Sequence, residues 1–315
     1  MENILVVGGC GYVGGILVDL LNNQKDIYNV VVYDNLLFES RYLKEVDFIN
    51  GDVTDESKLS RLINKFDVVI WLAGIVGDGA CSINPELTTA VNVKSVKWLV
   101  DNFTGKIIFP STCSVYGKNN NSLDETSTVR PLSLYAETKL EAEKYILENA
   151  KKPLVFRLGT LYGLSDNFSR IRLDLVVNIL TKKAVFGEPL SVFGGEQWRP
   201  LLHVHDVAHA MLFGLKKGLV GLLNLSEGNY KIIDIANKIK ELIPTATIVK
   251  NILIFEDSRN YKVNNNKIRQ EGWLPLYHID KGIQEMIELF NSNRIKCLED
   301  PVFSNVEYMQ LLYNK

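Results

Sequence analysis

The sequence has few cysteines and no segment of the kind that enters or crosses a membrane. Its four cysteines, Cys10, Cys81, Cys113 and Cys297, lie far apart in 315 residues and show no metal-ligand spacing. This usage favours a reduced, cytoplasmic protein over a disulfide-bonded secreted one. No apolar run approaches the ~18 residues that span a bilayer, and the N-terminal stretch MENILVVGG lacks a signal-peptide pattern. We therefore expect a cytoplasmic protein with no metal site and no membrane partner.

An excess of charge of one sign is also absent. The formal net charge is −2, and no long run of basic residues occurs, so nucleic acid and anionic membrane surfaces are poor candidates as partners. Hydrophobic residues make up 46% and charged residues 23% of the chain, which is typical of a globular protein. Its length suits one large domain or two smaller ones.

Short apolar runs alternate with helical patterns through the first half of the chain. Strands are expected at 4–7, 30–33, 48–50, 68–72, 106–109 and 154–158, and helices at 12–21, 55–64, 85–103 and 133–150. Fully apolar strands separated by helices predict an α/β fold with a parallel sheet covered on both faces. The alternation fades after Gly163 and returns at 203–215. We therefore predict a large domain of residues 1–163 and 201–227, and a smaller region of residues 164–200 and 228–315.

The first strand runs into a glycine-rich turn, ILVVGGCGYVGG. Gly8, Gly11 and Gly14 have GxxGxxG spacing between an apolar strand and a helical pattern. Glycines at such a turn let the backbone approach a pyrophosphate, which then lies at the helix N-terminus. We expect Gly8 and Gly11, together with Tyr12 and Val13, to contact a dinucleotide.

Acidic and small residues end the following strands. Asp34 comes after the second strand, where a carboxylate can accept hydrogen bonds from the adenosine ribose and would repel a 2′-phosphate, so NAD is favoured over NADP. Asp52, in GDVTD, is either an adenine-facing residue or simply part of a turn. The further expected cofactor contacts along these strand ends are Asn35, Val53, Leu72, Ala73 and Gly74.

Two stretches carry side chains suited to proton transfer. In YAETK, Tyr135 and Lys139 are four residues apart and share one face of a predicted helix. In FPSTCSVYG, Thr112 leaves the carboxyl end of a buried strand, where ligands of parallel sheets bind. A neighbouring ammonium and a positive nicotinamide would both lower the pKa of a tyrosine from about 10. We expect Tyr135 to act as the general base on an alcohol, with Thr112 hydrogen-bonded to the same oxygen.

Together these stretches resemble the extended short-chain dehydrogenase/reductase family, specifically its members that modify nucleotide sugars. The resemblance covers nearly the whole chain and rests on GGCGYVG, YDN, GDVTD, STCSVYG, YAETK, FRLGTLYG and RPLLHVHDVA. It implies that residues 1–163 and 201–227 form an NAD-binding Rossmann domain of the doubly wound type. The smaller α/β region would bind a nucleotide-diphosphate sugar. A homodimer through helices 85–103 and 133–150 is also implied.

The resemblance also implies contacts with the nucleotide sugar. Arg199 and Arg259 match positions that usually meet the diphosphate, and Asn178 matches a common contact with the sugar nucleotide. Arg170 and Arg172 could line the same cleft. Each of these arginines could instead be an ordinary surface charge.

Departures from the subfamily patterns indicate the reaction. Sugar 4,6-dehydratases usually carry Asp-Glu just after the threonine, where this chain has Cys113 and Ser114. The 3,5-epimerase/reductases of fucose type carry a reactive cysteine at the place of Ser114. Both chemistries are therefore disfavoured. What remains is oxidation at a sugar carbon, and C4 is the carbon that we expect.

Three interpretations follow for the function. WLAGIVGDGACSINPEL, RLDLVVN and QWRP resemble a subgroup proposed to include GDP-heptose 4-dehydrogenases of capsule polysaccharide synthesis, and this is the first expectation. A nucleotide-sugar 4-epimerase is the alternative enzyme. An NAD-binding regulatory protein is the alternative outside catalysis, which the presence of Thr112, Tyr135 and Lys139 argues against.

Overall fold

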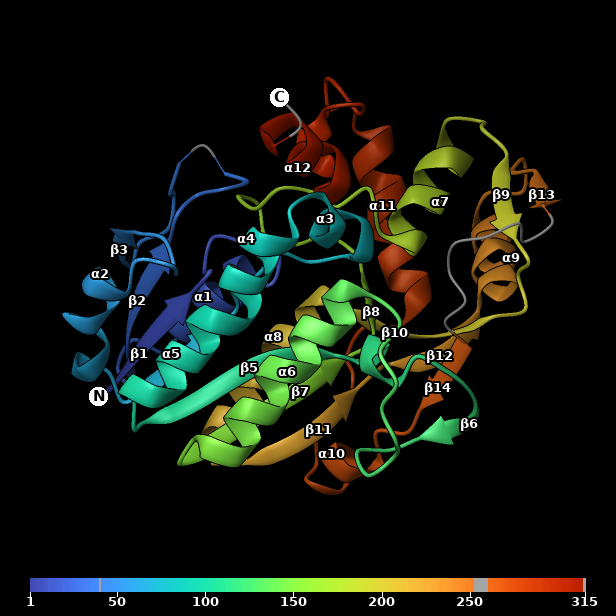
Figure 1. Cartoon of the computed structure of the whole chain (residues 1–315). Helices are drawn as coiled ribbons and strands as arrows, with labels where there is room; N and C mark the ends of the chain where they lie inside the picture. The colour runs from blue at the N-terminus through green and yellow to red at the C-terminus, as the bar shows by residue number, and fades with distance from the viewer. Residues whose placement is uncertain (40, 252–259, 314–315) are drawn as a thin grey trace.

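Seven parallel strands form the centre of the protein, which is described here by a computed structural model covering residues 1–39, 41–251 and 260–313. Their order is β11-β7-β5-β4-β1-β2-β3, and every neighbouring pair is parallel. The predicted Rossmann-type α/β fold is confirmed (Figure 1). The strands are β1 (Glu2–Val7), β2 (Tyr28–Asp34), β3 (Asp47–Asn50), β4 (Val68–Trp71), β5 (Lys106–Thr112), β7 (Lys152–Leu158) and β11 (Gly221–Leu225).

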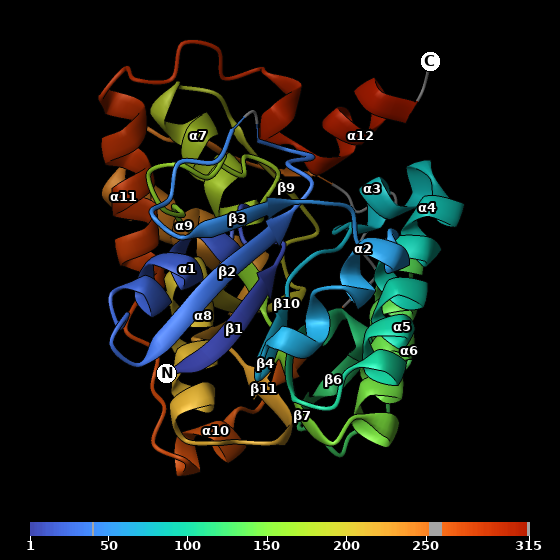
Figure 2. The same ribbon diagram turned by 90° about the vertical axis from the view of Figure 1, so that its left-hand side faces the viewer.

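Helices cover both faces of this sheet, as Figure 2 shows. One face carries α1 (Gly14–Asn22), α8 (Val204–Lys216) and α10 (Asn266–Gln270), and the other carries α2 (Glu56–Ser60), α5 (Ser95–Asn102) and α6 (Leu134–Asn149). Alternate residues of β1 enter the two cores, because successive strand side chains point to opposite faces. Ile4 and Val6 pack in the core under α1 and α8, whereas Leu5 and Val7 pack in the core under α5 and α6.

The helix expected at 85–103 is interrupted. It consists of α4 (Pro85–Thr89), a π-helical turn at Ala90–Lys94, and α5. Asn84 caps its start by accepting a hydrogen bond from the backbone N–H of Leu87. The π turn contains the buried Asn92, whose side-chain amide bonds both the N–H and the C=O of Ile75 at 2.9 Å. This inward polar contact connects the helix to the segment that follows β4.

A second part of the chain builds smaller sheets. A three-stranded sheet has the order β12-β10-β8, and two pairs, β13-β9 and β14-β6, flank it. These strands are β6 (Lys118–Leu123), β8 (Thr160–Tyr162), β9 (Leu190–Phe193), β10 (Trp198–His203), β12 (Gly228–Lys231), β13 (Ile248–Asn251) and β14 (Asn260–Val263). Its helices are α7 (Val176–Val185), α9 (Ile232–Leu242) and α11 (Ile279–Asn291). The remaining helical segments are α3 (Asp78–Ile83), α12 (Asn305–Tyr313) and the 3₁₀ turns Ile63–Lys65, Cys113–Tyr116 and Pro301–Phe303.

The predicted two-part division remains a proposal, and two C-terminal segments pass from one part to the other. Ile268 of α10 and Trp273 belong to the core beneath α1 and α8. The last helix, α12, packs against α3 beside the main sheet (Figure 1). No helix of the part that the structure describes is long and apolar enough to cross a membrane.

Candidate active site

A large cavity lies at the carboxyl ends of the central strands and has a volume of about 1670 Å³. Pockets for one small ligand usually measure ~300–1,000 Å³, so this cavity has room for two. It is lined by all the predicted cofactor contacts, namely Gly8, Gly11, Tyr12, Val13, Asp34, Asn35, Asp52, Val53, Leu72, Ala73 and Gly74, and by Thr112, Tyr135, Lys139, Arg170, Arg172 and Arg199.

The glycine turn connects β1 to α1, and its glycines have different roles. Gly8 has φ +83°, and a Cβ there would come within 2.5 Å of the backbone N of Ala73. A Cβ at Gly14 would lie 2.5 Å from the carbonyl oxygen of Gly8. At Gly11, by contrast, a Cβ would meet only that same oxygen at 3.5 Å, an ordinary contact. Gly11 therefore leaves open a part of the cavity that any larger residue would fill, as a site for a closely approaching pyrophosphate requires.

The Asp34 carboxylate connects the glycine turn to the segment after β2. It accepts hydrogen bonds from the backbone N–H of Cys10 at 3.0 Å and of Leu36 at 2.8 Å. Burial raises the pKa of Asp34, and these backbone hydrogen bonds act in the opposite direction. Its position at the cavity wall is the one expected for contact with an adenosine ribose.

Asp52 takes part in a turn and also lines the cavity. Its carboxylate accepts hydrogen bonds from the N–H and hydroxyl of Thr54, at 2.8 and 2.7 Å, and from the Asn35 amide at 2.8 Å. Although burial opposes ionisation, these hydrogen bonds hold the pKa of Asp52 below its ordinary value. The turn interpretation of Asp52 therefore agrees with the structure, and contact with an adenine stays a prediction.

Thr112, Tyr135 and Lys139 come together at the wall of this cavity. Thr112 ends β5, and its hydroxyl accepts a hydrogen bond from the backbone N–H of Ser114 at 3.1 Å. Tyr135 and Lys139 lie in the first two turns of α6, whose N-terminus is capped by Ser133. The side chains of Thr112 and Tyr135 are within hydrogen-bonding reach of one another. Thr112 and Tyr135 thus meet side chain to side chain, and Lys139 lines the same cavity one turn further along α6.

The sequence predicts a lowered pKa for Tyr135, whereas the pKa is raised in the folded protein. Burial raises the pKa of Tyr135, as does the neighbouring Cys81, and the hydrogen bond from Thr112 opposes both. Burial also lowers the pKa of Lys139 to about 7, against the effects of Cys81 and Glu143. The loss of hydration outweighs the interactions among the protein's own groups, so burial favours the neutral phenol of Tyr135 in the protein alone.

A buried ion pair supports the trio from behind. Glu143 lies one turn beyond Lys139 on α6 and accepts a hydrogen bond from the Ser111 hydroxyl at 2.5 Å. The guanidinium of Arg157, on β7, donates to both carboxylate oxygens of Glu143 at 2.5–3.1 Å. This network fastens α6 to the ends of β5 and β7 and so fixes the distance from Tyr135 to Thr112. The sequence analysis missed Glu143, although its i+4 spacing from Lys139 was a usable signal.

The predicted substrate contacts have different outcomes. Arg172 and Arg199 line the cavity, and Arg172 is paired with Asp174 through hydrogen bonds of 2.6 and 2.9 Å. Arg199, on β10, is buried and donates to the carbonyl oxygen of Trp198. Arg259 lies outside the described residues.

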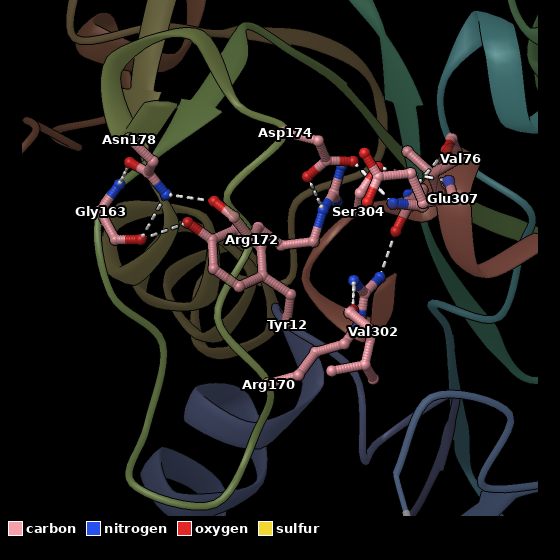
Figure 3. Close-up of polar contacts among 11 residues, drawn as sticks. Tyr12, Val76, Gly163, Arg170, Arg172, Asp174, Asn178, Val302, Ser304 and Glu307 are labelled. Carbon is pink, nitrogen blue, oxygen red and sulfur yellow. Dashed lines mark hydrogen bonds and ion pairs between the residues drawn. The ribbon is translucent and has the colours of Figure 1, made fainter. Parts of the chain in front are cut away.

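Asn178 is a correction, because the structure does not place its side chain at the cavity. The residue is fully buried. Its amide is occupied by the N–H and C=O of Gly163, at 3.0 and 3.2 Å, and by the carbonyl oxygen of Arg172 at 2.8 Å (Figure 3). Asn178 therefore holds together the loop that follows β8. The match of this position to a family pattern could not show that the amide is fully engaged within the protein.

The residues after Thr112 point in different directions. Cys113 is fully buried, and its thiol contacts the carbonyl oxygen of Arg157. Ser114 lines the cavity, and its hydroxyl lies 3.4 Å from the hydroxyl of Tyr261. Neither position supplies the carboxylates that a dehydration would use. Among the described residues, no group of three or more His, Cys, Asp or Glu side chains is placed to hold a metal ion.

A Cβ at Gly8 and one at Gly11 should have different consequences. We expect Gly8→Ala to lower the free energy of unfolding by about 1–3 kcal/mol, because the positive φ and the contact with Ala73 both oppose it. We expect Gly11→Ala to unfold at nearly the native temperature and to bind NAD about tenfold or more weakly, because its Cβ enters the cavity. Thermal unfolding and calorimetric titration with NAD measure the two effects. Equal NAD affinity in Gly11→Ala and native protein would contradict the placement of the pyrophosphate.

Burial of Lys139 should make the stability of the cofactor-free protein depend on pH. Below pH 7 the folded and unfolded states both carry the proton, and the folded state bears the full cost of the buried charge. Between about 7 and the ordinary pKa of 10.5 this cost falls as the pH rises. Lys139→Met should therefore raise the melting temperature by about 2–6 °C at pH 6, and by progressively less toward pH 10.

The control for that experiment is Lys144→Met, on the exposed face of the same helix. Surface substitutions usually change the free energy of unfolding by less than about 0.5 kcal/mol, so its melting temperature should follow the native one at every pH. A gain for Lys139→Met that is independent of pH would show that the ammonium is not the cause.

Comparison with known proteins agrees with this geometry. A sequence model of the NAD dependent epimerase/dehydratase family matches residues 4–225. A putative UDP-glucose 4-epimerase of Methanocaldococcus jannaschii is 28% identical, over 92% of this chain and 99% of its own. An ADP-L-glycero-D-manno-heptose-6-epimerase of Brachyspira hyodysenteriae is 25% identical, over 92% of this chain and 98% of its own. The crystal structure of UDP-glucose 4-epimerase from Thermotoga maritima with UDP-glucose is 25% identical, with a TM-score of 0.78 over 92% of this chain and 99% of that one.

Proposed function

Because the chain belongs to the NAD-dependent epimerase/dehydratase family, we propose that it oxidises C4 of a nucleotide-linked sugar. The observation that carries the proposal is the convergence of Thr112, Tyr135 and Lys139 on the cavity that also contains the glycine turn and Asp34. A non-catalytic NAD-binding protein would have no use for a tyrosine and a lysine buried at this cost.

The chain's own residues handle the proton. Tyr135, once ionised, accepts the proton of the sugar hydroxyl, and Thr112 hydrogen-bonds the same oxygen and orients it. Lys139 would stabilise the ionised phenol, and the negative charge of Glu143 favours the protonated form of Lys139. Bound NAD supplies the hydride acceptor. The cavity wall provided by Ser114 and Tyr261 offers hydroxyls, and no carboxylate, to the sugar.

The first candidate substrate is a GDP-linked heptose oxidised at C4 and released as the keto sugar, for capsule or surface polysaccharide synthesis. It is supported by the stretches WLAGIVGDGACSINPEL, RLDLVVN and QWRP. It is also in keeping with the similarity to an enzyme named for a nucleotide-linked heptose. Electrostatically, Arg199 at the cavity wall suits the diphosphate that such a substrate carries.

A 4-epimerase is the second candidate. In this reaction the keto sugar rotates within the site, and the hydride returns to the opposite face of the sugar. The names of two similar proteins, both UDP-glucose 4-epimerases by description, favour this candidate. The same three residues serve both reactions, so the trio by itself does not distinguish them.

Product analysis separates the candidates. Native protein with NAD is incubated with GDP-, UDP- and dTDP-linked sugars, including a GDP-heptose, and the products are analysed by mass spectrometry. A loss of two daltons marks the dehydrogenase, and an unchanged mass with altered stereochemistry marks the epimerase. Tyr135→Phe should lower turnover about 100-fold or more while NAD binding stays unchanged. Undiminished turnover in this variant would show that another group is the base.

We further propose a cytoplasmic homodimer through the α4–α5 segment and α6. The three buried free cysteines suit a reducing compartment. On the two helices, the outward positions carry the ion pair between Lys97 and Glu141, and the half-buried Trp98 and Tyr145 supply apolar area. Sedimentation equilibrium tests the dimer, and a mass of one chain at micromolar concentration would oppose it.

A further inference from the structure

We infer that Arg170 and Arg172 bind the pyrophosphate of the dinucleotide, and that the diphosphate of the sugar nucleotide is bound elsewhere. The inference changes the role expected for Arg172, from a substrate contact to a cofactor contact. It rests on the dinucleotide-binding part of the proposed function and is independent of which sugar is oxidised.

The loop that carries the two arginines is fastened to the glycine turn. The hydroxyl of Tyr12 donates to the carbonyl oxygen of Gly163 at 2.5 Å. In return, the Ser165 hydroxyl donates to the carbonyl oxygen of Tyr12 at 2.6 Å, and the Ser169 hydroxyl lies 3.3 Å from the carbonyl oxygen of Gly11. These contacts hold the loop directly against the residues where a pyrophosphate is expected. The next residues of the loop are the arginines.

The two guanidinium groups are close enough to repel one another, and they face different parts of the dinucleotide site. Arg172 has its guanidinium carbon 5.8 Å from the centre of the Tyr12 ring. Burial raises the pKa of Tyr135, and the charge of Arg172 opposes that effect, so this guanidinium is also near the proposed base. Arg172 therefore lies on the nicotinamide side.

Arg170 lies on the adenosine side. Its guanidinium carbon is 3.9 Å from the centre of the Phe38 ring, and its backbone N–H donates to the Glu39 carboxylate at 2.7 Å. Phe38 and Glu39 belong to the segment that follows Asp34, the expected ribose contact. A pyrophosphate joins the two nucleoside halves of NAD, so it would lie between the parts of the site that Arg170 and Arg172 face.

The side chains of the two arginines have different kinds of partner (Figure 3). Arg172 forms its ion pair with Asp174. Arg170 donates to uncharged acceptors, the carbonyl oxygen of Val302 at 2.7 Å and the amide oxygen of Asn305. Burial and the neighbouring charge of Arg172 lower the pKa of Arg170 to about 9. A bound anion would relieve both the repulsion and the lost hydration.

The substrate's diphosphate would meet a different arginine. Arg199 comes from β10 in the three-stranded sheet, and it lines the same cavity from the substrate region. The proposed reaction brings together two anionic groups, the pyrophosphate of NAD and the diphosphate of the substrate. Arg170 and Arg172 would bind the first, and Arg199 would bind the second. Asn305, at the start of α12, accepts a hydrogen bond from the Arg170 guanidinium, and its backbone N–H donates to the Asp174 carboxylate. Asn305 therefore helps to hold Arg170 and the ion pair of Arg172 in place.

The test measures binding and needs no turnover. Three variants are prepared free of bound nucleotide: Arg170→Gln, Arg172→Gln and, as the reciprocal control, Arg199→Gln. Each variant is titrated calorimetrically with NAD, ADP-ribose, adenosine and GDP. ADP-ribose contains the pyrophosphate without the nicotinamide, and adenosine contains neither. We expect each of the first two variants to bind NAD and ADP-ribose about tenfold to a hundredfold more weakly, because each loses a hydrogen bond to a charged group. Their affinity for adenosine and GDP should be unchanged, and Arg199→Gln should show the opposite pattern.

Two results would overturn the inference. One is native affinity for NAD and ADP-ribose in both variants, and the other is a weakened affinity for GDP with NAD unaffected. Because Arg172→Gln leaves the Asp174 charge unpaired, the double variant Arg172→Gln/Asp174→Asn must show the same loss, with its melting temperature measured alongside. If NAD binding depends on the arginines and no nucleotide sugar is oxidised by native protein, the proposed function fails while this inference stands.

Discussion

The parallel arrangement of the central strands is the constraint on which the rest of the molecule depends. Since every neighbouring pair is parallel, all the carboxyl ends emerge at one edge of the sheet. Gly8, Asp34, Ala73 and Thr112 lie at or just beyond the carboxyl ends of four different strands and are far apart in the sequence, yet they line one cavity. Strand pairing thereby builds most of the site before any polar side chain contributes.

Burial then determines the chemistry of the site. A phenol and an amine on the first turns of α6 lose their hydration together, and both their pKa values shift toward the neutral forms. The buried pair of Glu143 and Arg157 keeps α6 in register with the strand ends, and the negative charge of Glu143 favours protonated Lys139. Tyr135 and Lys139 are thus held in position with pKa values that the charge of a cationic ligand would change. Oxidised dinucleotide would be such a ligand.

The remainder of the chain closes the cavity from the other side. The loop after β8 is hydrogen-bonded to the glycine turn, and the last helix returns from the smaller region to pack on α3 (Figure 1). Arg170 connects this loop to the C-terminal segment through Val302 and Asn305 (Figure 3). Contacts between the two parts therefore converge beside the cofactor site.

By itself, the sequence determined the parallel α/β fold, the glycine turn, Asp34 and the pairing of Tyr135 with Lys139, because each depends on local spacing or on the apolar character of a single strand. Only the tertiary structure decided that Asn178 is engaged inside its own loop, that Glu143 supports the trio, and that Arg170 and Arg172 lie beside the glycine turn. These roles depend on contacts between residues that are remote in the chain. Such contacts are set by how the loops pack, which no local pattern encodes.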